Sequence, residues 1–244
     1  MLERRSLRIL RQHVETDRLL GVEAVPVGRP VALSVTTPAT APADVPGGLD
    51  RAEKLRLLTA MDENEVRSCA KCALCEGRTR TVFGEGDPDA ALMFIGEGPG
   101  QQEDETGRPF VGRAGEMLDK QIAAIGLRRE EVYIANVVKC RPPNNRAPTP
   151  AEADACWGYL RRQIEIIRPH VIVTLGAPAT HRILQTRQGI TSIRGTWQRL
   201  DLGEGLEIPV MPTFHPAYLL RAYTVENRRK VWSDLQKAAE KLKG

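Results

Sequence analysis

The chain has 244 residues, with 35 Lys and Arg against 31 Asp and Glu, which gives a formal net charge of only +4. This length suits one sizeable domain with an appendage, or two small ones. Apolar runs such as 90–96 and 171–176 are far below the roughly 18 residues that a membrane-spanning helix needs. With no signal peptide visible at the N-terminus, we expect a cytoplasmic protein that makes no membrane contact. The small positive charge permits nucleic-acid binding without requiring it.

The first fifty residues differ in composition from the rest. Leu7, Leu10 and Val14 recur at helical spacing, which predicts a short helix within 1–20. Five prolines fall within 21–50 and predict an extended linker with no core of its own. The remaining residues, 51–244, are predicted to form the functional domain.

Beyond the linker, predicted helices and strands alternate. Apolar or β-branched runs predict strands, and apolar residues at 3/4 spacing predict helices. Thr149, Pro150 and Glu152 form a capping box that opens one of these helices. The alternation predicts an α/β fold with a mainly parallel four-stranded sheet covered by helices on both faces. The predicted strands are 91–95, 132–138, 171–175 and 208–213, and the predicted helices are about 50–66, 114–125, 149–168, one starting at 176, and 225–242.

Three segments of distinctive chemistry follow predicted strands. They are the glycine loop 96–100, the segment 136–146 and the tripeptide 214–216. In parallel sheets, ligands bind beyond the carboxyl ends of the strands. We therefore expect these segments to meet at one active site.

The residues of these segments have both structural and functional interpretations. The glycine loop lets a ligand approach the backbone closely. It lacks the G-x-G-x-x-G spacing of a dinucleotide site, however, and a simple turn explains it equally well. A single histidine such as His215 is more often structural, but its position at the sheet edge favours a functional role. Asn136 could simply end its strand, although an amide can also read the edge of a base because it both donates and accepts.

Five cysteines, an odd number, argue against a disulfide framework and for a metal site. Cys69, Cys72 and Cys75 lie close together, whereas Cys140 and Cys156 lie far downstream. Either Cys140 completes the local trio, or Cys69 and Cys72 combine with the distant pair. Four cysteine ligands suit zinc or a [4Fe–4S] cluster, and spacing alone does not separate the two. Cys75 by itself is better explained as a small apolar residue.

Seven short strings stand out between Cys69 and the C-terminus. They are Glu76-Gly-Arg-Thr-Arg80, Phe83-Gly-Glu-Gly86, Gly96-Glu-Gly-Pro-Gly100, Glu103-Asp104, Thr106-Gly-Arg-Pro-Phe-Val-Gly112, Asn136-Val-Val-Lys-Cys-Arg-Pro-Pro143 and His215-Pro-Ala-Tyr-Leu-Leu-Arg221. In the order and spacing of these strings, the chain resembles the family 4, iron–sulfur type uracil-DNA glycosylases.

This resemblance implies a three-layer α/β/α fold and hydrolysis of the N-glycosidic bond of deoxyuridine in DNA. It also implies a [4Fe–4S] cluster whose ligands are Cys69, Cys72, Cys140 and Cys156. Cys75 is then not a ligand. The uracil pocket it implies comprises Gly96, Glu97, Gly98, Phe110, Asn136 and His215.

Catalytic roles follow from the chemistry of this pocket. Phe110 would stack on the flipped base, Asn136 would read its edge, and His215 would stabilise the departing uracil. The family 1 glycosylases carry an aspartate where Gly98 stands, so another carboxylate must position the water. Glu97, Glu103 and Asp104 are the nearby carboxylates, and Glu103 is favoured for positioning the water or limiting the space around uracil C5. Segment 144–148 lacks the histidine with which a relative of this family traps the sugar, so we expect turnover by hydrolysis.

DNA binding is expected to combine charge with a wedge. Arg113, Arg141 and Arg146 would hold phosphates. Leu219, Leu220 and Arg221 would fill the space left by the base, although the leucines could equally be core residues. We expect a monomer acting on uracil-containing DNA, either single- or double-stranded. Two alternatives are an iron–sulfur DNA-binding module that holds a base without cleaving it, and an accessory domain of another DNA enzyme.

Overall fold

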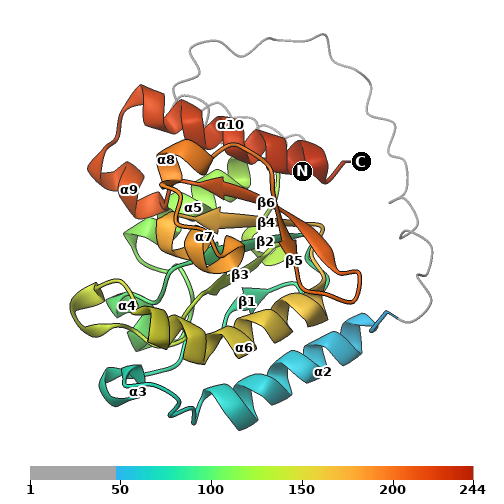
Figure 1. The fold of residues 1–244 in the computed structure, drawn as a ribbon, viewed down its shortest axis with the longest axis vertical. Helices are drawn as coiled ribbons and strands as arrows, with labels where there is room; N and C mark the ends of the chain where they lie inside the picture. Colours follow the sequence, from blue (N-terminus) through green and yellow to red (C-terminus); the bar gives the residue numbers. More distant parts are fainter. Residues whose placement is uncertain (1–47, 244) are drawn as a thin grey trace, which may run out of the picture.

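The computed structural model describes residues 48–243. The helix predicted within 1–20 and nearly all of the linker predicted over 21–50 lie outside the described residues. Figure 1 shows the arrangement of the described part, in which helices lie above and below one twisted sheet.

The sheet has six strands in the order β1-β3-β2-β4-β6-β5. The four central strands are parallel, as predicted: β3 (Tyr133–Asn136), β2 (Leu92–Gly96), β4 (Val171–Leu175) and β6 (Glu207–Thr213). The prediction of only four strands is wrong, because β1 (Glu85–Gly86) and β5 (Gln198–Asp201) add antiparallel edges. Both edge strands are short and polar, so neither has the apolar run that marks a buried strand.

Alternate residues of the central strands pack into two separate cores. Met93 and Ile95 face one core and Leu92 and Phe94 the other, as the two-residue period of a strand requires. Helices α2 (Arg51–Met61), α6 (Pro150–Ile167) and α7 (Ala177–Leu184) cover the first face. Helices α5 (Arg113–Ala124), α9 (Pro216–Arg221) and α10 (Val225–Lys241) cover the second. The three-layer α/β/α architecture is confirmed (Figure 1).

The predicted helices appear with small changes of boundary. The helix expected over about 50–66 consists of α2 followed by one π-helical turn, η1 (Asp62–Val66). The capping box at Thr149 forms as predicted, with its side chain accepting from the backbone N–H of Glu152 at 3.2 Å. Shorter elements not predicted are α3 (Leu74–Gly77), α4 (Gln101–Thr106), η2 (Arg129–Glu131), η3 (Pro143–Asn145), α8 (Ile190–Ile193) and α9.

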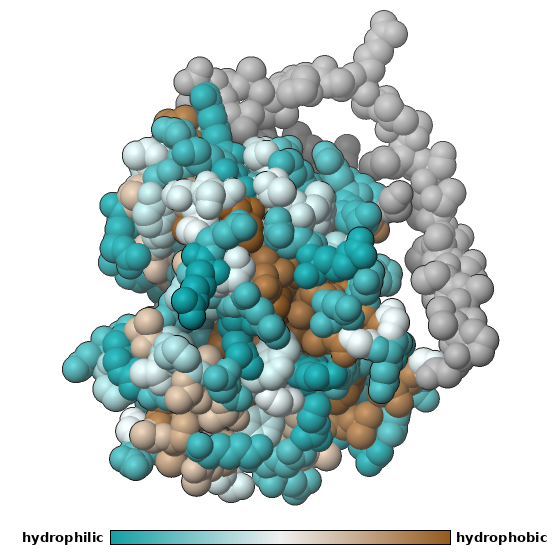
Figure 2. Space-filling view, in the orientation of Figure 1, coloured by the Kyte–Doolittle hydropathy of each residue, from teal (hydrophilic) through white to brown (hydrophobic). Residues whose placement is uncertain are grey.

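On the face shown in Figure 2, hydrophilic side chains dominate, and hydrophobic ones gather in the middle around α7 and β5. Within residues 48–243, no helix combines the length and the hydrophobicity needed to cross a membrane.

Candidate active site

A cavity of about 770 Å³ opens at the carboxyl ends of the four parallel strands. Its lining includes the loop after β2, the last residue of β3, the glycine after β4 and the segment after β6. The three segments that the sequence places at this edge do meet there. β2 lies between β3 and β4, so the chain continues from β2 to one side of the sheet and then crosses to the other. The cavity lies at this topological switch point, which is the usual ligand site of such sheets. The residues predicted for the site that do line this cavity are Glu97, Gly98, Glu103, Phe110, Asn136, Arg146, His215 and Arg221.

Gly96 brings the side chains of Asn136 and Phe110 together. A Cβ at Gly96 would lie 2.4 Å from Oδ1 of Asn136 and 2.5 Å from the Phe110 ring, so only glycine fits between them. Asn136 is 1% exposed, and its Oδ1 has no hydrogen-bond partner within the described residues. A buried, unpaired amide oxygen costs about 1–3 kcal/mol. It is therefore an acceptor that a ligand in the cavity could satisfy.

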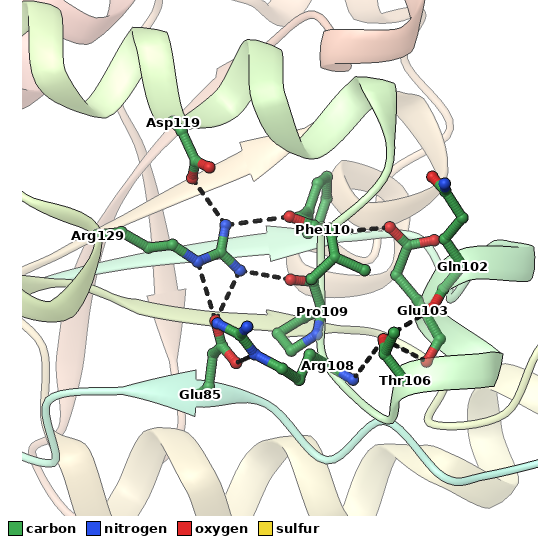
Figure 3. A network of polar contacts seen from close by, with 10 residues as sticks. Glu85, Gln102, Glu103, Thr106, Arg108, Pro109, Phe110, Asp119 and Arg129 are labelled. Atoms are coloured by element: carbon green, nitrogen blue, oxygen red, sulfur yellow. Dashed lines mark hydrogen bonds and ion pairs between the residues drawn. The ribbon is translucent and has the colours of Figure 1, made fainter.

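The backbone of Phe110 is strained. Its φ is +51°, a left-handed conformation that costs an aromatic residue about 1–3 kcal/mol unless its surroundings enforce it. Arg129 donates to the carbonyl oxygens of Pro109 and Phe110, and the Glu103 carboxylate accepts from the N–H groups of Val111 and Gly112 at 2.8 and 2.9 Å (Figure 3). Contacts on both sides thus fix the loop that presents the ring.

His215 lies 5.7 Å from Phe110, measured between ring centroids, with a tilt of 31°. It caps α9, and its Nδ1 accepts from the backbone N–H of Ala217 at 3.1 Å. Burial and the nearby Arg221 charge lower the pKa of His215 to about 4, with Glu103 opposing them. The imidazole is therefore neutral at pH 7, and its single proton is on Nε2, because Nδ1 is an acceptor.

The two predicted carboxylates have different environments. Glu103 accepts three backbone N–H bonds, from Gly100, Val111 and Gly112, so its oxygens are occupied in holding the loop. Glu97 is half-buried, and its carboxylate has no hydrogen-bond or ion-pair partner among residues 48–243, although its backbone oxygen accepts from the N–H of Val138 at 3.2 Å. Burial raises the pKa of Glu97. Glu103 thus holds backbone N–H groups of the loop, whereas the Glu97 carboxylate lies at the cavity without a partner.

The predicted DNA-contacting residues are distributed unevenly. Arg146 and Arg221 line the cavity, whereas Arg113, Arg141 and Leu220 do not. Arg146 makes a two-point ion pair with Glu152, at 2.6 and 2.8 Å. The expectation that Leu219 contacts DNA is wrong, because this residue is fully buried in the core between α5, α9 and α10.

All five cysteines line one small cavity between the start of the domain and α6. Cys140 and Cys156 are buried, and protein N–H groups approach both sulfurs. Arg78 donates to Sγ of Cys140 at 3.3 Å, and the backbone N–H of Lys139 donates to Sγ of Cys156 at 3.4 Å. No three His, Cys, Asp or Glu side chains within 48–243 converge closely enough to hold a single metal ion.

Several lining residues were not predicted. Asn145, Ile190, Thr191 and Tyr218 line the cavity. Asn145 belongs to segment 136–146 and Tyr218 to the string that begins at His215, so the sequence predicts their neighbourhood but does not single them out. For α8, only the folded structure reveals that Ile190 and Thr191 reach the cavity.

The chain matches the model of the uracil DNA glycosylase superfamily over residues 83–236. It is 51% identical over 179 residues to the Type-4 uracil-DNA glycosylase of Thermotoga maritima, covering 73% of this chain and 91% of that one. The Type-4 enzymes of Sulfurisphaera tokodaii and Saccharolobus solfataricus are each 46% identical, over 79% and 73% of this chain and 85% and 84% of their own lengths. The chain belongs to the uracil-DNA glycosylase superfamily. Within it, the chain is a member of the Type-4 family.

Proposed function

We propose that this protein excises uracil from DNA by hydrolysing the N-glycosidic bond of deoxyuridine, which leaves an abasic site. The observation that carries this proposal is that Asn136 lines the cavity while its Oδ1 is buried and unpaired beside the Phe110 ring. A base within a duplex is inaccessible at its sugar, so it must be flipped into this cavity at a cost of a few kcal/mol.

Asn136 and Phe110 recognise the flipped base. Stacking on Phe110 contributes about 1–3 kcal/mol and favours no particular base. The Asn136 amide provides selectivity, since its oxygen accepts from uracil N3–H and its NH₂ donates to O4. Cytosine presents the opposite pattern and would leave buried polar groups unpaired, a mismatch that rejects it strongly.

His215 stabilises the leaving group. As the bond between C1′ and N1 breaks, its electron pair moves onto the uracil, and negative charge grows on O2. The Nε2–H of a neutral imidazole donates to that oxygen without first giving up a proton. Such preorganised donors typically contribute about 10²–10³ in rate. This role is supported by the Ala217 contact, which leaves the proton on Nε2.

Glu97 positions the water. The departure of uracil leaves an oxocarbenium-like sugar, and the water oxygen adds to C1′ while its proton passes to a carboxylate. Glu97 lines the cavity with both oxygens uncommitted, whereas Glu103 is committed to three backbone N–H groups. This difference supports Glu97 in the role.

The cysteine site fits a [4Fe–4S] cluster held by Cys69, Cys72, Cys140 and Cys156. All four of these sulfurs line the same cavity, so a single group could bridge them. N–H donors to sulfur, as at Cys140 and Cys156, are typical of iron–sulfur sites. The cluster would cross-link the chain around Cys69 to the segment that begins at Asn136, and would contribute no step to hydrolysis.

DNA binding relies on the cavity rim. Arg221 is exposed there, and Arg146 would exchange part of its contact with Glu152 for a phosphate. Leu220 is half-buried on the same short helix as Arg221 and would act as the wedge. We extend the proposal to a monomer that acts on single- and double-stranded DNA in the cytoplasm, where its unpaired cysteines stay reduced.

A panel of oligonucleotides tests the function. Single strands that each carry one deoxyuridine, deoxycytidine or thymidine are incubated with the protein and then treated with alkali, which breaks the strand at an abasic site. Cleavage at deoxyuridine alone is expected. No cleavage of any strand by the folded protein would favour a binding module that holds a base without cleaving it.

A further inference from the structure

We infer that Arg129 is a positioning residue that fixes the pose in which Phe110 stacks on the base. This inference rests on the proposed function. Arg129 lies on η2, outside the cavity lining, so it does not touch the substrate and acts through the Phe110 backbone.

The guanidinium of Arg129 holds two consecutive carbonyl groups. Nη1 donates to the oxygen of Phe110 at 3.0 Å, and Nη2 donates to the oxygen of Pro109 (Figure 3). These contacts fall on the residue whose φ of +51° needs support from its surroundings. The planar fork of arginine can reach both oxygens at once, whereas the single ammonium of lysine cannot do so with the same geometry.

Arg129 is itself held in place. Asp119 accepts from Nη1 at 2.7 Å and Glu85 accepts from Nε at 2.9 Å, so the side chain is only 19% exposed. Burial tends to raise the pKa of Glu85, but hydrogen bonds from Arg108 and Arg129 keep it below its ordinary value. The Glu85 carboxylate is therefore charged at neutral pH and anchors the arginine.

Two neighbours complete the restraint on the Phe110 backbone. Glu103 holds the N–H groups that follow Phe110, so the ring is presented between two fixed peptide segments. A Cβ at Gly115 would lie only 1.9 Å from the Phe110 oxygen, which means that this carbonyl is pressed against α5.

Arg108 provides a matched control. It binds the same Glu85 carboxylate, at 2.8 and 3.1 Å, but is 61% exposed and makes no contact with either carbonyl. Substitution of Arg108 removes an arginine from the same ion-pair network while leaving the Phe110 backbone in place.

The test compares kcat and KM on single-stranded uracil DNA for the wild type, R129K, R108K, F110A and the double variant F110A/R129K. R129K is expected to lower kcat/KM about ten- to hundredfold, in line with the effect of misplacing a group by about 1 Å. R108K should stay within about twofold of the wild type. Because Arg129 acts through the ring, F110A/R129K should be no slower than F110A, a non-additivity that a general loss of stability would not produce.

If the wild type is active and R129K is equally active, the inference fails while the proposed function stands. The inference also fails if the R129K substitution lowers the rate of F110A by the same factor as it lowers the rate of the wild type. A wild type that releases no uracil would overturn the proposed function and this inference with it.

G115A is a second variant for the case in which R129K does not fold: it keeps Arg129 but displaces the Phe110 carbonyl from the side of α5. G115A should lower kcat/KM as R129K does, and F110A/G115A should be no slower than F110A. A folded G115A with full activity would count against the inference.

Discussion

The backbone N–H of Ala217 donates to Nδ1 of His215 across 3.1 Å, which makes His215 both the cap of α9 and a neutral donor facing the cavity. One side chain thus links the stability of α9 to the chemistry of the site, and the link has a consequence for pH dependence.

Because its pKa is lowered to about 4, His215 binds a proton less readily in the folded chain than in the unfolded one. Between pH 6.5 and pH 4 the unfolded state takes up the proton first, so stability should fall as the pH falls through this window. The contribution is at most about 3 kcal/mol. Urea unfolding of the wild type and His215→Asn at several pH values measures it. Asparagine keeps the helix cap, so equal pH dependence in both proteins would contradict the assignment.

Gly96→Ala should abolish most uracil release. Its Cβ would push apart Asn136 and Phe110, which it would meet at 2.4 and 2.5 Å, and we expect a loss of at least about 10²-fold. Gly158→Ala is the matched control, because a Cβ at Gly158 in α6 meets nothing within 4 Å. This control should keep full activity and gain about 1 kcal/mol of stability. Single-turnover rates and urea unfolding test both variants, and full activity of Gly96→Ala would refute the packing described here.

Exchanging each of the two carboxylates separates their roles. Glu97→Gln should lower the rate about 10²-fold with little change in melting temperature, because only the cavity loses a carboxylate. Glu103→Ala should lower the melting temperature as well as the rate, because three backbone N–H groups lose their acceptor. Thermal unfolding and single-turnover assays on the same preparations distinguish the two. A destabilised Glu97→Gln or an inactive but fully stable Glu103→Ala would reverse the assignment.

Cysteine substitutions identify the ligands of the cluster. Cys156→Ser should reduce iron and sulfide per chain and lower stability before it alters base preference. Cys75→Ser should retain iron, sulfide and the brown absorbance of the wild type. Metal analysis and absorbance measure both effects, and a colourless but fully active wild type would remove the cluster from the account.

The sequence predicts the central sheet well because buried parallel strands are continuous apolar runs; Val171–Leu175 matches its prediction at both ends. The edge strands β1 and β5 escape notice because they are short and polar, and their existence depends on pairing with a formed sheet. Local sequence thus determines the centre of the fold better than its edges.

The site shows the same division. Asn136 and His215 are predictable because Asn136 ends a strand, His215 closely follows another, and parallel strands end at one edge. The φ of Phe110 is not predictable, since it depends on Arg129, nineteen residues further along the chain. The burial of Leu219 and the loop contacts of Glu103 are unpredictable for a related reason: residue type suggests what a side chain can do, but only the fold decides what it contacts.

The most direct test of the account is the single-turnover rate at which the wild type and Asn136→Ala release free uracil from the same deoxyuridine strand. We predict rapid release by the wild type and a rate about 10²–10³-fold lower for the variant, which loses the amide that pairs with the base. Equal rates for the two proteins, or a folded wild type that releases no uracil, would contradict it.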